Sequence, residues 1–375
     1  MLAEHLTRRE FLRLASAGVT MTSGLAPSRT PVFAANPVPA ERISVVPDES
    51  SRRVDIAIDG QPFTAYIWPT TLKKPVLYPL RTANSTVITR GFPLEPRPGE
   101  RTDHPHHAGL WLNYENVNGL DFWNNSDAIK PEDAPKMGTI LHRRIVSAKS
   151  GSEHGELDVE TDWVNFEKKA LLGERTRYVF RGGPVVRAVD RITTLTALEG
   201  KVALPDAKDG MLGLRVIRAL EIPSDKPETY TDAASRPTSV AKLDNTGVNG
   251  TYLTSEGKKG DAAWGTRGRW CNLSGTVTPN EPAKLSADRE PITISIFDHP
   301  SNVGFPTYWH ARGYGLFAAN PLGQKIFSNG KEELNFALAP RASVTFRYRI
   351  VISNAILSPE VTEVAYKEFV AAYRA

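Results

Sequence analysis

Residues 344–352 have the sequence Val-Thr-Phe-Arg-Tyr-Arg-Ile-Val-Ile, in which a large apolar side chain occupies every second position. Successive side chains of a β-strand point to opposite faces, so this alternation gathers Phe346, Tyr348 and Ile350 on one face. A period of two over this length predicts a strand with one buried face.

The same period recurs along most of the chain. It is found at residues 54–58, 157–163, 178–180, 186–195, 292–296 and 334–338. The turn dipeptides Asp59-Gly60 and Gly182-Gly183 follow two of these runs, and the chain contains 28 Gly and 28 Pro. These features predict an all-β protein, a large antiparallel β-sandwich. Because no linker and no fixed-period repeat interrupts the pattern, we expect one sandwich domain over residues 36–375.

One helix is expected at the C-terminal end. Ser358 can cap its first turn, Pro359 suits the first helical position and Glu360 complements the helix dipole. The apolar residues that follow form one stripe, made of Val361, Val364, Ala365, Phe369, Ala372 and Tyr373. We expect this helix to cover the sandwich. Residues 224–259 are rich in Ser, Thr, Asp, Gly and Lys and are expected to form long loops.

The N-terminus has the three parts of a twin-arginine export signal. Arg8 and Arg9 precede a weakly apolar run over residues 14–26, and small residues follow at 34–35. We therefore expect residues 1–35 to be a signal peptide and the mature protein to be periplasmic or secreted. No later run approaches the ~18 apolar residues of a spanning helix, so no membrane span is expected in the mature protein.

Composition narrows the classes of function. The chain carries 46 Lys+Arg against 42 Asp+Glu and a single cysteine, Cys271, which excludes an intramolecular disulfide and a multi-cysteine zinc site. The basic excess is concentrated in the signal segment and no aromatic-interleaved basic stretch follows, so no nucleic-acid partner is expected. Gly-x-Ser-x-Gly, P-loop, dinucleotide and His-Glu-x-x-His motifs are also absent from the sequence.

Histidine is the most informative residue type in the chain. His104, His106 and His107 lie in Asp-His-Pro-His-His, His299 lies in Asp-His-Pro, and His310 lies in Tyr-Trp-His. Imidazole titrates near neutral pH and suits proton transfer, so these five are the candidate catalytic residues. The first and last motifs are far apart in sequence, but distant strands meet routinely in a sandwich, and we expect both motifs to face one cleft.

A divalent metal is an alternative interpretation of the same histidines. Neutral imidazoles are common metal ligands, and His104 and His106 could share one ion with His299 or His310. Further candidate ligands are Asp103, Glu115 and Asp121. The cofactor is therefore left open.

Aromatic and polar side chains follow the first histidine motif. Trp111, Tyr114, Asp121 and Trp123 lie in a stretch rich in Asn, and aromatic faces can stack on a sugar ring while carboxylates and amides bind its hydroxyls. For Trp111 a position in the core is the competing interpretation. The other candidate substrate-binding residues are Lys208, Arg215, Arg267 and Arg312. The expected partner is a small-molecule sugar or a glycan.

Several motifs together resemble a known family. They are Asp103-His104-Pro105-His106-His107, Gly109-Leu110-Trp111, Val117-Asn118-Gly119, Asp121-Phe122-Trp123, Asp206 with Lys208 and Gly210, Trp264-Gly265 with Arg267, Asp298-His299-Pro300, Tyr308-Trp309-His310, Gly315-Leu316-Phe317 and Asn320-Pro321. This pattern resembles the bacterial family labelled methane oxygenase PmoA-like, with Ala108 and Asp209 as departures from it. The resemblance implies a secreted sandwich of the galactose-mutarotase-like kind, grouped with carbohydrate degradation, and it brings no settled catalytic residues.

Three hypotheses follow for function. The first is a secreted carbohydrate-active enzyme that cleaves, eliminates from or epimerises a sugar, with acid–base work shared by histidines and a carboxylate. The second is a metal-dependent oxygenase or lyase with a histidine-ligated metal. The third is a non-catalytic glycan-binding sandwich.

The export signal gives a direct test. Replacing Arg8 and Arg9 with Lys should cause the unexported precursor to accumulate in the cytoplasm, because the twin-arginine machinery recognises the paired arginines. Cell fractionation followed by immunoblotting measures the effect, and an unchanged periplasmic yield would contradict the expectation.

Overall fold

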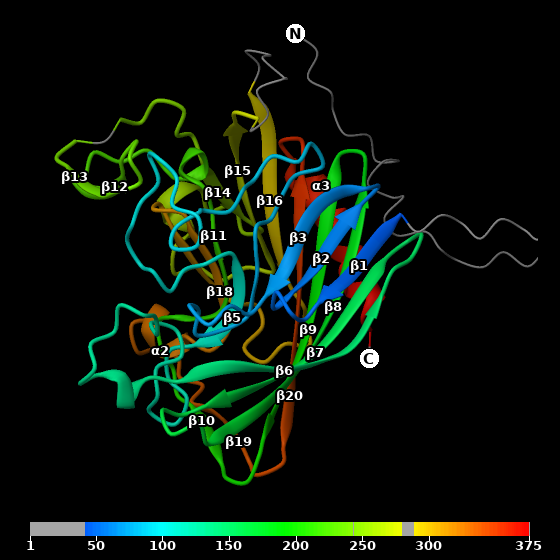
Figure 1. Ribbon diagram of the computed structural model, residues 1–375, viewed down its shortest axis with the longest axis vertical. Helices are drawn as coiled ribbons and strands as arrows, with labels where there is room; N and C mark the ends of the chain where they lie inside the picture. Colours follow the sequence, from blue (N-terminus) through cyan, green and yellow to red (C-terminus); the bar gives the residue numbers. More distant parts are fainter. Residues whose placement is uncertain (1–41, 243, 280–288, 375) are drawn as a thin grey trace, which may run out of the picture.

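Two eight-stranded antiparallel sheets dominate the fold, as the computed structural model shows for residues 42–242, 244–279 and 289–374 (Figure 1). The first sheet has the order β1 (Ile43–Asp48), β2 (Arg53–Ile58), β3 (Gln61–Ile67), β4 (Val76–Leu77), β5 (Leu110–Tyr114), β11 (Gly210–Arg215), β18 (Leu316–Asn320) and β17 (Tyr308–Arg312). The second has the order β14 (Thr251–Thr254), β15 (Trp270–Val277), β16 (Glu290–Asp298), β20 (Ser343–Ser353), β9 (Val186–Ala197), β8 (Ala170–Gly183), β7 (Gly155–Val164) and β6 (Thr139–Lys149). The expected segment of the signal peptide lies outside the described residues.

Short elements complete the fold. Two ribbons pair β10 (Val202–Leu204) with β19 (Phe336–Leu338) and β12 (Glu228–Thr231) with β13 (Pro237–Val240). In the described residues, three 3-10 turns lie at η1 (Ala134–Lys136), η2 (Arg218–Leu220) and η3 (Gly260–Ala263), and the helices are α2 (Gln324–Phe327) and α3 (Pro359–Ala372). No helix in the described part of the chain has the length and apolarity needed to cross a bilayer.

The sandwich core forms where the inner faces of the sheets meet. Along β7, the alternating residues Leu157, Val159, Thr161 and Trp163 are all buried, as the period of two predicts. The largest apolar cluster joins such residues to side chains from the first sheet, including Leu112 of β5. The predicted all-β sandwich is therefore confirmed.

The C-terminal helix is also confirmed. The Ser358 hydroxyl accepts a hydrogen bond from the Val361 N–H and Pro359 occupies the first turn, as a capped helix start requires. Phe369 packs with Val186 and Phe297 on the outer side of the second sheet. Figure 1 shows α3, in red, along the far side of that sheet.

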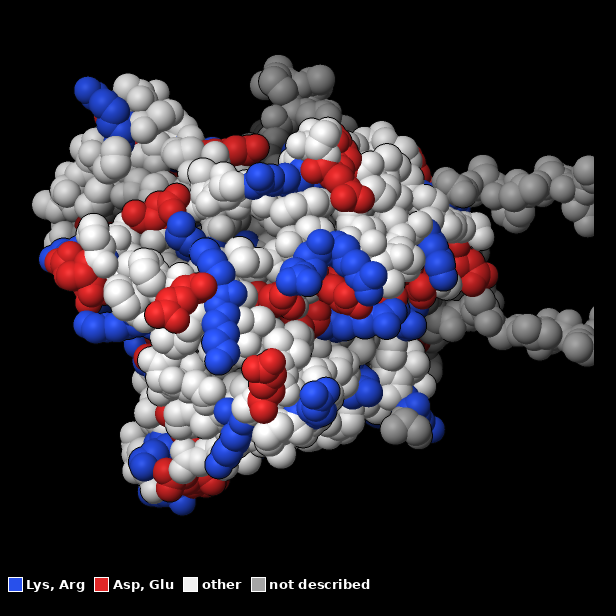
Figure 2. All heavy atoms as spheres, turned by 60° about the horizontal axis from the view of Figure 1, so that its bottom comes forward, with Lys and Arg blue, Asp and Glu red and all other residues white. Residues whose placement is uncertain are grey.

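Two local expectations are corrected. The turn between β8 and β9 lies at residues 184–185, because Gly182 and Gly183 extend β8 and pair with Arg187 and Val186. The segment expected as long loops contains the β12–β13 ribbon and β14, which pairs with β15 at the edge of the second sheet. On the face drawn in Figure 2, Lys and Arg side chains are interspersed with Asp and Glu.

A buried charged pair, Glu174 and Arg191, lies within the core, and its contribution to the free energy of unfolding can be measured. The Glu174 carboxylate accepts hydrogen bonds from Trp163 Nε1 (2.7 Å), Thr176 Oγ1 (2.6 Å) and the Arg191 guanidinium (2.8 Å). Changing Glu174 to Ala should lower the free energy of unfolding by about 3–5 kcal/mol, because Arg191 would stay buried without its counter-charge. Urea denaturation measures this loss.

The matched control removes both charges at once. Glu174→Met with Arg191→Met should cost far less than the single change, because neither charge is then left alone in the core. A single change that costs less than about 1 kcal/mol would contradict the interpretation, since exposed ion pairs have that low value.

Candidate functional site

The outer face of the first sheet carries one row of aligned side chains. Trp111 on β5 pairs with Gly213 on β11, Gly213 pairs with Ala318 on β18, and Ala318 pairs with His310 on β17. Directly paired residues of antiparallel strands project from the same face, so Trp111 and His310 share a surface despite their separation in sequence. A side chain at Gly213 would come within 2.5 Å of the Trp111 ring, so glycine is required there.

A second row lies two residues further along the same strands. Arg215 on β11 and Arg312 on β17 both pair with Leu316 on β18. The ring of Tyr314, from the turn between β17 and β18, lies 4.8 Å from the Arg215 guanidinium and 5.7 Å from that of Arg312. Three strands thus supply Trp111, His310, Arg215 and Arg312 to one face.

The first histidine motif wraps around a buried arginine above this face. Arg90 is 1% exposed, and its guanidinium donates to the backbone carbonyls of Asp103 (2.8 Å), His104 (2.9 Å) and His107 (3.1 Å). It also donates to Asp103 Oδ1 at 2.6 Å, and Arg215 donates to the same oxygen at 2.7 Å. The two arginines therefore fix both the course of the loop and the position of its carboxylate.

Asp103 and His104 form the first histidine–carboxylate pair. His104 Nδ1 lies 2.5 Å from Asp103 Oδ2, and the imidazole stacks on Tyr314 at 5.1 Å. Burial alone would raise the pKa of Asp103, but the hydrogen bond from His104 and the charges of Arg215 and Arg90 hold that pKa well below its usual range. The ionised carboxylate accepts the Nδ1 proton, and because the His104 side chain is 41% exposed, a bound molecule can reach it.

His106 and His107 are buried beneath His104. Arg215 donates to His107 Nδ1 at 3.2 Å, so the neutral His107 ring carries its proton on Nε2. Burial lowers the pKa of His107 well below its ordinary value, and burial with the charge of Lys74 lowers that of His106 to about 2. Neither Nε2 has a hydrogen-bond partner among the described residues. At neutral pH both rings are therefore uncharged.

His310 and Asp209 form the second histidine–carboxylate pair. His310 Nδ1 lies 3.1 Å from the Lys208 carbonyl and 3.3 Å from Asp209 Oδ1. Because the carbonyl only accepts, Nδ1 carries the proton and Nε2 of the neutral ring carries the lone pair. Burial lowers the pKa of His310 to about 3, although the Lys208 carbonyl acts in the opposite direction.

Asp209 titrates much closer to neutrality than an ordinary aspartate. Burial raises its pKa to about 6, the charges of Glu115 and Asp121 add to this, and the Lys208 ammonium opposes it. The loop is held in place because the Asp209 N–H donates to Glu115 Oε2 at 2.8 Å. Lys208 itself projects into solvent, with its Nζ 3.5 Å from Asp209 Oδ2.

Lys74 lies behind the histidine motif. Its ammonium donates to the His106 carbonyl at 2.7 Å and lies 5.2 Å from the centroid of the Trp111 ring. Burial lowers the pKa of Lys74 to about 7, with the charge of Asp121 opposing the shift. Asp121 contributes charge to the site, while its two oxygens accept from the backbone and side-chain amides of Asn124 at 2.9 and 2.8 Å.

Three predicted sugar-binding aromatics support the site instead of facing a ligand. Trp111 and Trp123 are almost fully buried and contact each other at 5.2 Å between ring centroids. Tyr114 points to the sandwich interior, where its hydroxyl bonds to the carbonyls of Pro205 and Leu322. The alternation of β5 places Trp111 on the outer face of the sheet, but the histidine loop covers its ring. Trp111 is therefore a packed residue, which was the alternative to a role in ligand binding.

Two further predicted site residues lie elsewhere or are fully engaged. His299 lies beside α3, with its ring 5.3 Å from Phe369 and its Nδ1 2.7 Å from Ser301 Oγ, so the structure does not bring it to the other four histidines. Arg267 donates to the carbonyls of Pro306 and Gly304 and to Glu332 at 2.9 Å. It fastens the loop before β17 and is not directed at a ligand.

The exposed aromatic surface of the site comes from Trp264, which the predicted set of binding residues omits. Trp264 is 41% exposed, the Arg312 guanidinium lies 5.1 Å from its ring, and the His310 ring lies 6.5 Å away. Arg90 and Tyr314 were missed as well. The sequence signal for Trp264 was the motif Trp264-Gly265 with Arg267, which was assigned to Arg267 alone, and Arg90 had no signal.

The metal interpretation does not fit the observed donors. Within residues 42–242, 244–279 and 289–374, no three His, Cys, Asp or Glu side chains are grouped so that they could hold an ion. His299 is remote from the other histidines, and Asp103 is occupied by two arginines. We therefore derive no step through a metal.

The chain matches solved structures whose descriptions name galactosidases and a galactose mutarotase-like protein. A galactose mutarotase-like protein from Clostridium acetobutylicum is 11% identical, with a TM-score of 0.37 over 83% of this chain and 98% of that one. The galactosidase domain of an alpha-galactosidase-sucrose kinase is 10% identical, with a TM-score of 0.36 over 83% of this chain and 41% of that one. A GH36 alpha-galactosidase from Geobacillus stearothermophilus is 11% identical, with a TM-score of 0.35 over 81% of this chain and 42% of that one.

The chain thus spans 41% and 42% of the lengths of the two galactosidase chains. A comparison with curated proteins finds no match. A family model described as "Family of unknown function (DUF6807)" matches residues 53–367. Because this match covers most of the chain, including both histidine–carboxylate pairs, the protein belongs to the DUF6807 family.

Proposed function

We propose that this protein is an exported carbohydrate-active enzyme that carries out acid–base chemistry on a sugar bound at the outer face of the first sheet. The observation that carries the proposal is the convergence of two histidine–carboxylate pairs, Asp103–His104 and His310–Asp209, on that face. The two pairs are linked through Tyr314, whose ring stacks on His104 at 5.1 Å and lies 5.7 Å from the guanidinium of Arg312, two residues after His310 on β17. Cleavage, elimination and epimerisation of a sugar all require one group that accepts a proton and one that donates it.

His310 is suited to the role of general base. Its Nδ1 proton is held by the Lys208 carbonyl, which directs the lone pair to Nε2. Burial keeps the ring neutral at pH 7 by lowering its pKa to about 3. The Asp209 carboxylate, 3.3 Å from Nδ1, stabilises the imidazolium formed when Nε2 takes up a proton.

His104 is suited to the complementary role. Its Nδ1 is fixed by a carboxylate that two arginines keep ionised, so the ring is held in one orientation and Nε2 is its atom for proton transfer. Its exposed ring can reach a bound sugar from the side of the loop, while His310 acts from the sheet. One proton donor and one proton acceptor therefore approach the substrate from different elements.

The side chains around the two pairs favour a sugar as the substrate. Trp264 offers an exposed ring for stacking on the C–H face of a pyranose. Arg312 lies next to Trp264, and Lys208 lies next to Asp209. Both side chains can donate hydrogen bonds to the hydroxyl groups of a sugar.

Proton NMR in ²H₂O tests the proposal, because each of the three candidate reactions changes the spectrum in its own way. The purified mature protein is incubated with a panel of monosaccharides, glycosides and oligosaccharides. Epimerisation through carbon acids would remove a C–H signal by deuterium exchange, elimination would create a vinylic signal, and hydrolysis would create new anomeric signals. Saturation transfer from the protein to a sugar without any of these spectral changes would support the glycan-binding alternative. If no sugar of the panel shows saturation transfer or a spectral change, both the enzymatic proposal and the glycan-binding alternative are contradicted.

The exposed and buried histidines should respond differently to truncation. His104→Ala should lower kcat by about 10²–10⁴-fold on whichever panel sugar reacts, because it removes a proton-transfer group. Its melting temperature should change little because the side chain is exposed. His107→Ala should instead lower stability by about 1–3 kcal/mol, because the buried Arg215 loses an acceptor.

The control for these variants is His154→Ala. His154 has a similar exposure, 44% of its side chain, but lies in the turn before β7. It should change neither activity nor melting temperature. Full turnover in His104→Ala would rule out the assigned role for His104.

The pKa of Asp209 predicts the acid limb of the pH profile. With its pKa raised to about 6 by burial, Asp209 is ionised above that pH and neutral below it. Only the ionised form stabilises a protonated His310, so kcat/KM should rise with pH through about 6 and then level off. Asp209→Asn should show a lower plateau and lose this limb. Finding the same limb in the Asn variant would assign it to another group.

A further inference from the structure

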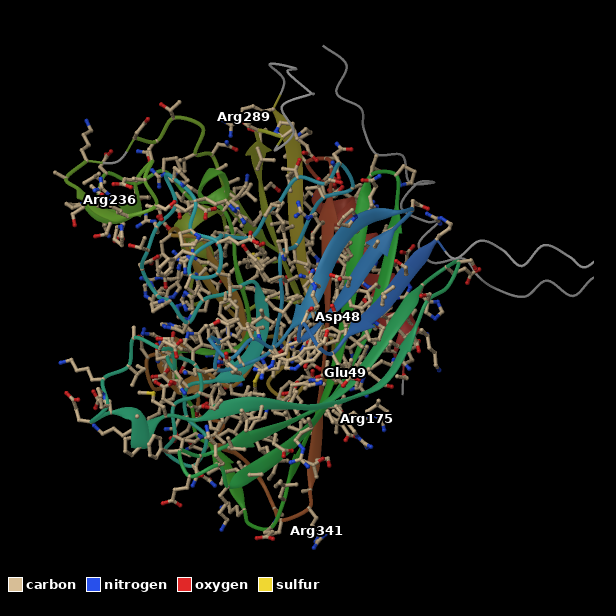
Figure 3. All side chains as sticks on the ribbon, in the orientation of Figure 1. Asp48, Glu49, Arg175, Arg236, Arg289 and Arg341 are labelled. Carbon is tan, nitrogen blue, oxygen red and sulfur yellow. The ribbon has the colours of Figure 1, made fainter. Side chains whose placement is uncertain are left out.

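A groove of about 780 Å³ lies beside the candidate site and takes no part in the proposed chemistry. Its walls come from the β1–β2 turn, residues 68–75, residues 125–137, the first half of β6 and the β7–β8 turn. Figure 3 shows Glu49, in the turn between β1 and β2, toward β6 and β7. Five segments distant in sequence therefore enclose one surface depression of a size suited to a small ligand.

An aromatic platform forms one wall of the groove. The Trp68 and His142 rings stack at 4.0 Å with an angle of 26° between them. The Tyr66 hydroxyl lies 3.0 Å from His142 Nδ1 and fixes the ring, while His142 Nε2 has no hydrogen-bond partner among the described residues. Burial lowers the pKa of His142 to about 4, so the platform is uncharged at neutral pH.

Basic side chains outnumber acidic ones around this platform. The lining includes Arg52, Lys73, Lys74, Arg143 and Lys168 against Glu49 and Asp127. Lys73 is paired with Asp127, and Arg143 is paired with Asp162 at 2.7 Å. In the described part of the chain Arg52 and Lys168 have no carboxylate within ion-pair distance, so the groove has net positive charge available to a ligand.

Lys74 connects the groove to the candidate site. It lines the groove although its side chain is only 5% exposed, and its ammonium donates to the His106 carbonyl at 2.7 Å. The histidine motif and the groove are therefore two sides of one wall. Lys74 therefore joins the wall of the groove to the loop that carries His104.

We propose that the groove is a second binding subsite and that its ligand is an acidic saccharide unit, one that bears a carboxylate. The stacked rings provide a flat apolar surface for the sugar ring, and Arg52 and Lys168 provide the counter-charges for its carboxylate. The term saccharide rests on the proposed function, whereas the preference for an anion rests on the groove alone.

The test compares acidic trisaccharides with their own neutral counterparts. Each uronate-bearing trisaccharide of a panel is paired with its carboxyl-reduced form, and calorimetry measures the dissociation constants with the mature protein. The acidic member of the best-binding pair should bind at least ~10-fold tighter, and added salt should reduce the difference because the attraction is electrostatic. Equal binding of the two members, or no binding across the panel, would overturn the proposal.

Variants assign the binding to the groove. Arg52→Gln with Lys168→Gln should reduce the preference for the acidic form to ~2-fold, because it removes the two available charges. The control, Arg53→Gln with Lys169→Gln, makes the same change in net charge at neighbouring residues that do not line the groove, and it should retain the preference. Loss of preference in both double variants would point to a nonspecific effect of charge and reject the groove.

Changes at the platform and at the site separate the two proposals. Trp68→Ala should weaken both members of the pair ~10-fold, and Trp68→Phe should restore part of the affinity, because stacking requires an aromatic ring. His310→Gln should abolish turnover and leave the preference for the acidic form intact. If the wild-type protein turns over no sugar but the groove variants behave as stated, the proposed function fails and this subsite stands; unchanged binding by Trp68→Ala rejects the subsite.

Discussion

The burial of Arg90 is the constraint on which the candidate site depends. A guanidinium without contact with water must find acceptors for its protons, because an ion left unsatisfied in the interior costs several kcal/mol. The histidine motif supplies acceptors for the two terminal nitrogens by turning three carbonyls and the Asp103 carboxylate toward them, while Nε has no partner among the described residues. This path places His104 at a φ of 45°, a conformation that costs a non-glycine residue of order 1–3 kcal/mol and that the bonds to Arg90 offset.

Arg215 transmits this arrangement to the sheet. Burial and the charge of Arg215 lower the pKa of Arg90 to about 9, so the two cations oppose each other and Asp103 must lie between them. Arg215 belongs to β11, and its position over the sheet is set by the register with β5 and β18. The histidine loop, the Asp103 carboxylate and the outer face of the first sheet therefore form one unit. The absence of a side chain at Gly213 leaves room on this face for the Trp111 ring, which the histidine loop covers.

The sequence predicts the strands well because one buried face imposes a period of two, as along β7 and β20. It also predicts that His104, His106, His107 and His310 belong together. It does not predict which outer-face residues a loop will cover, and for this reason Trp111 and Trp123 were expected to bind a ligand while the exposed Trp264 was not. Arg90 was not foreseen, because a buried arginine has no local pattern: its partners lie in a loop that the sequence leaves unplaced.

The two carboxylates of the site show how the same group can take opposite roles. Asp103 and Asp209 are both largely buried, which by itself would raise the pKa of each. Two arginines and His104 reverse the effect at Asp103, which stays ionised and orients its histidine. Asp209 has one exposed lysine against two nearby carboxylates, so its pKa stays raised, at about 6. A fixed anion in the histidine loop and a titrating carboxyl in the loop before β11 give the two histidines different electrostatic environments, and the proposed division into one proton donor and one proton acceptor rests on this difference.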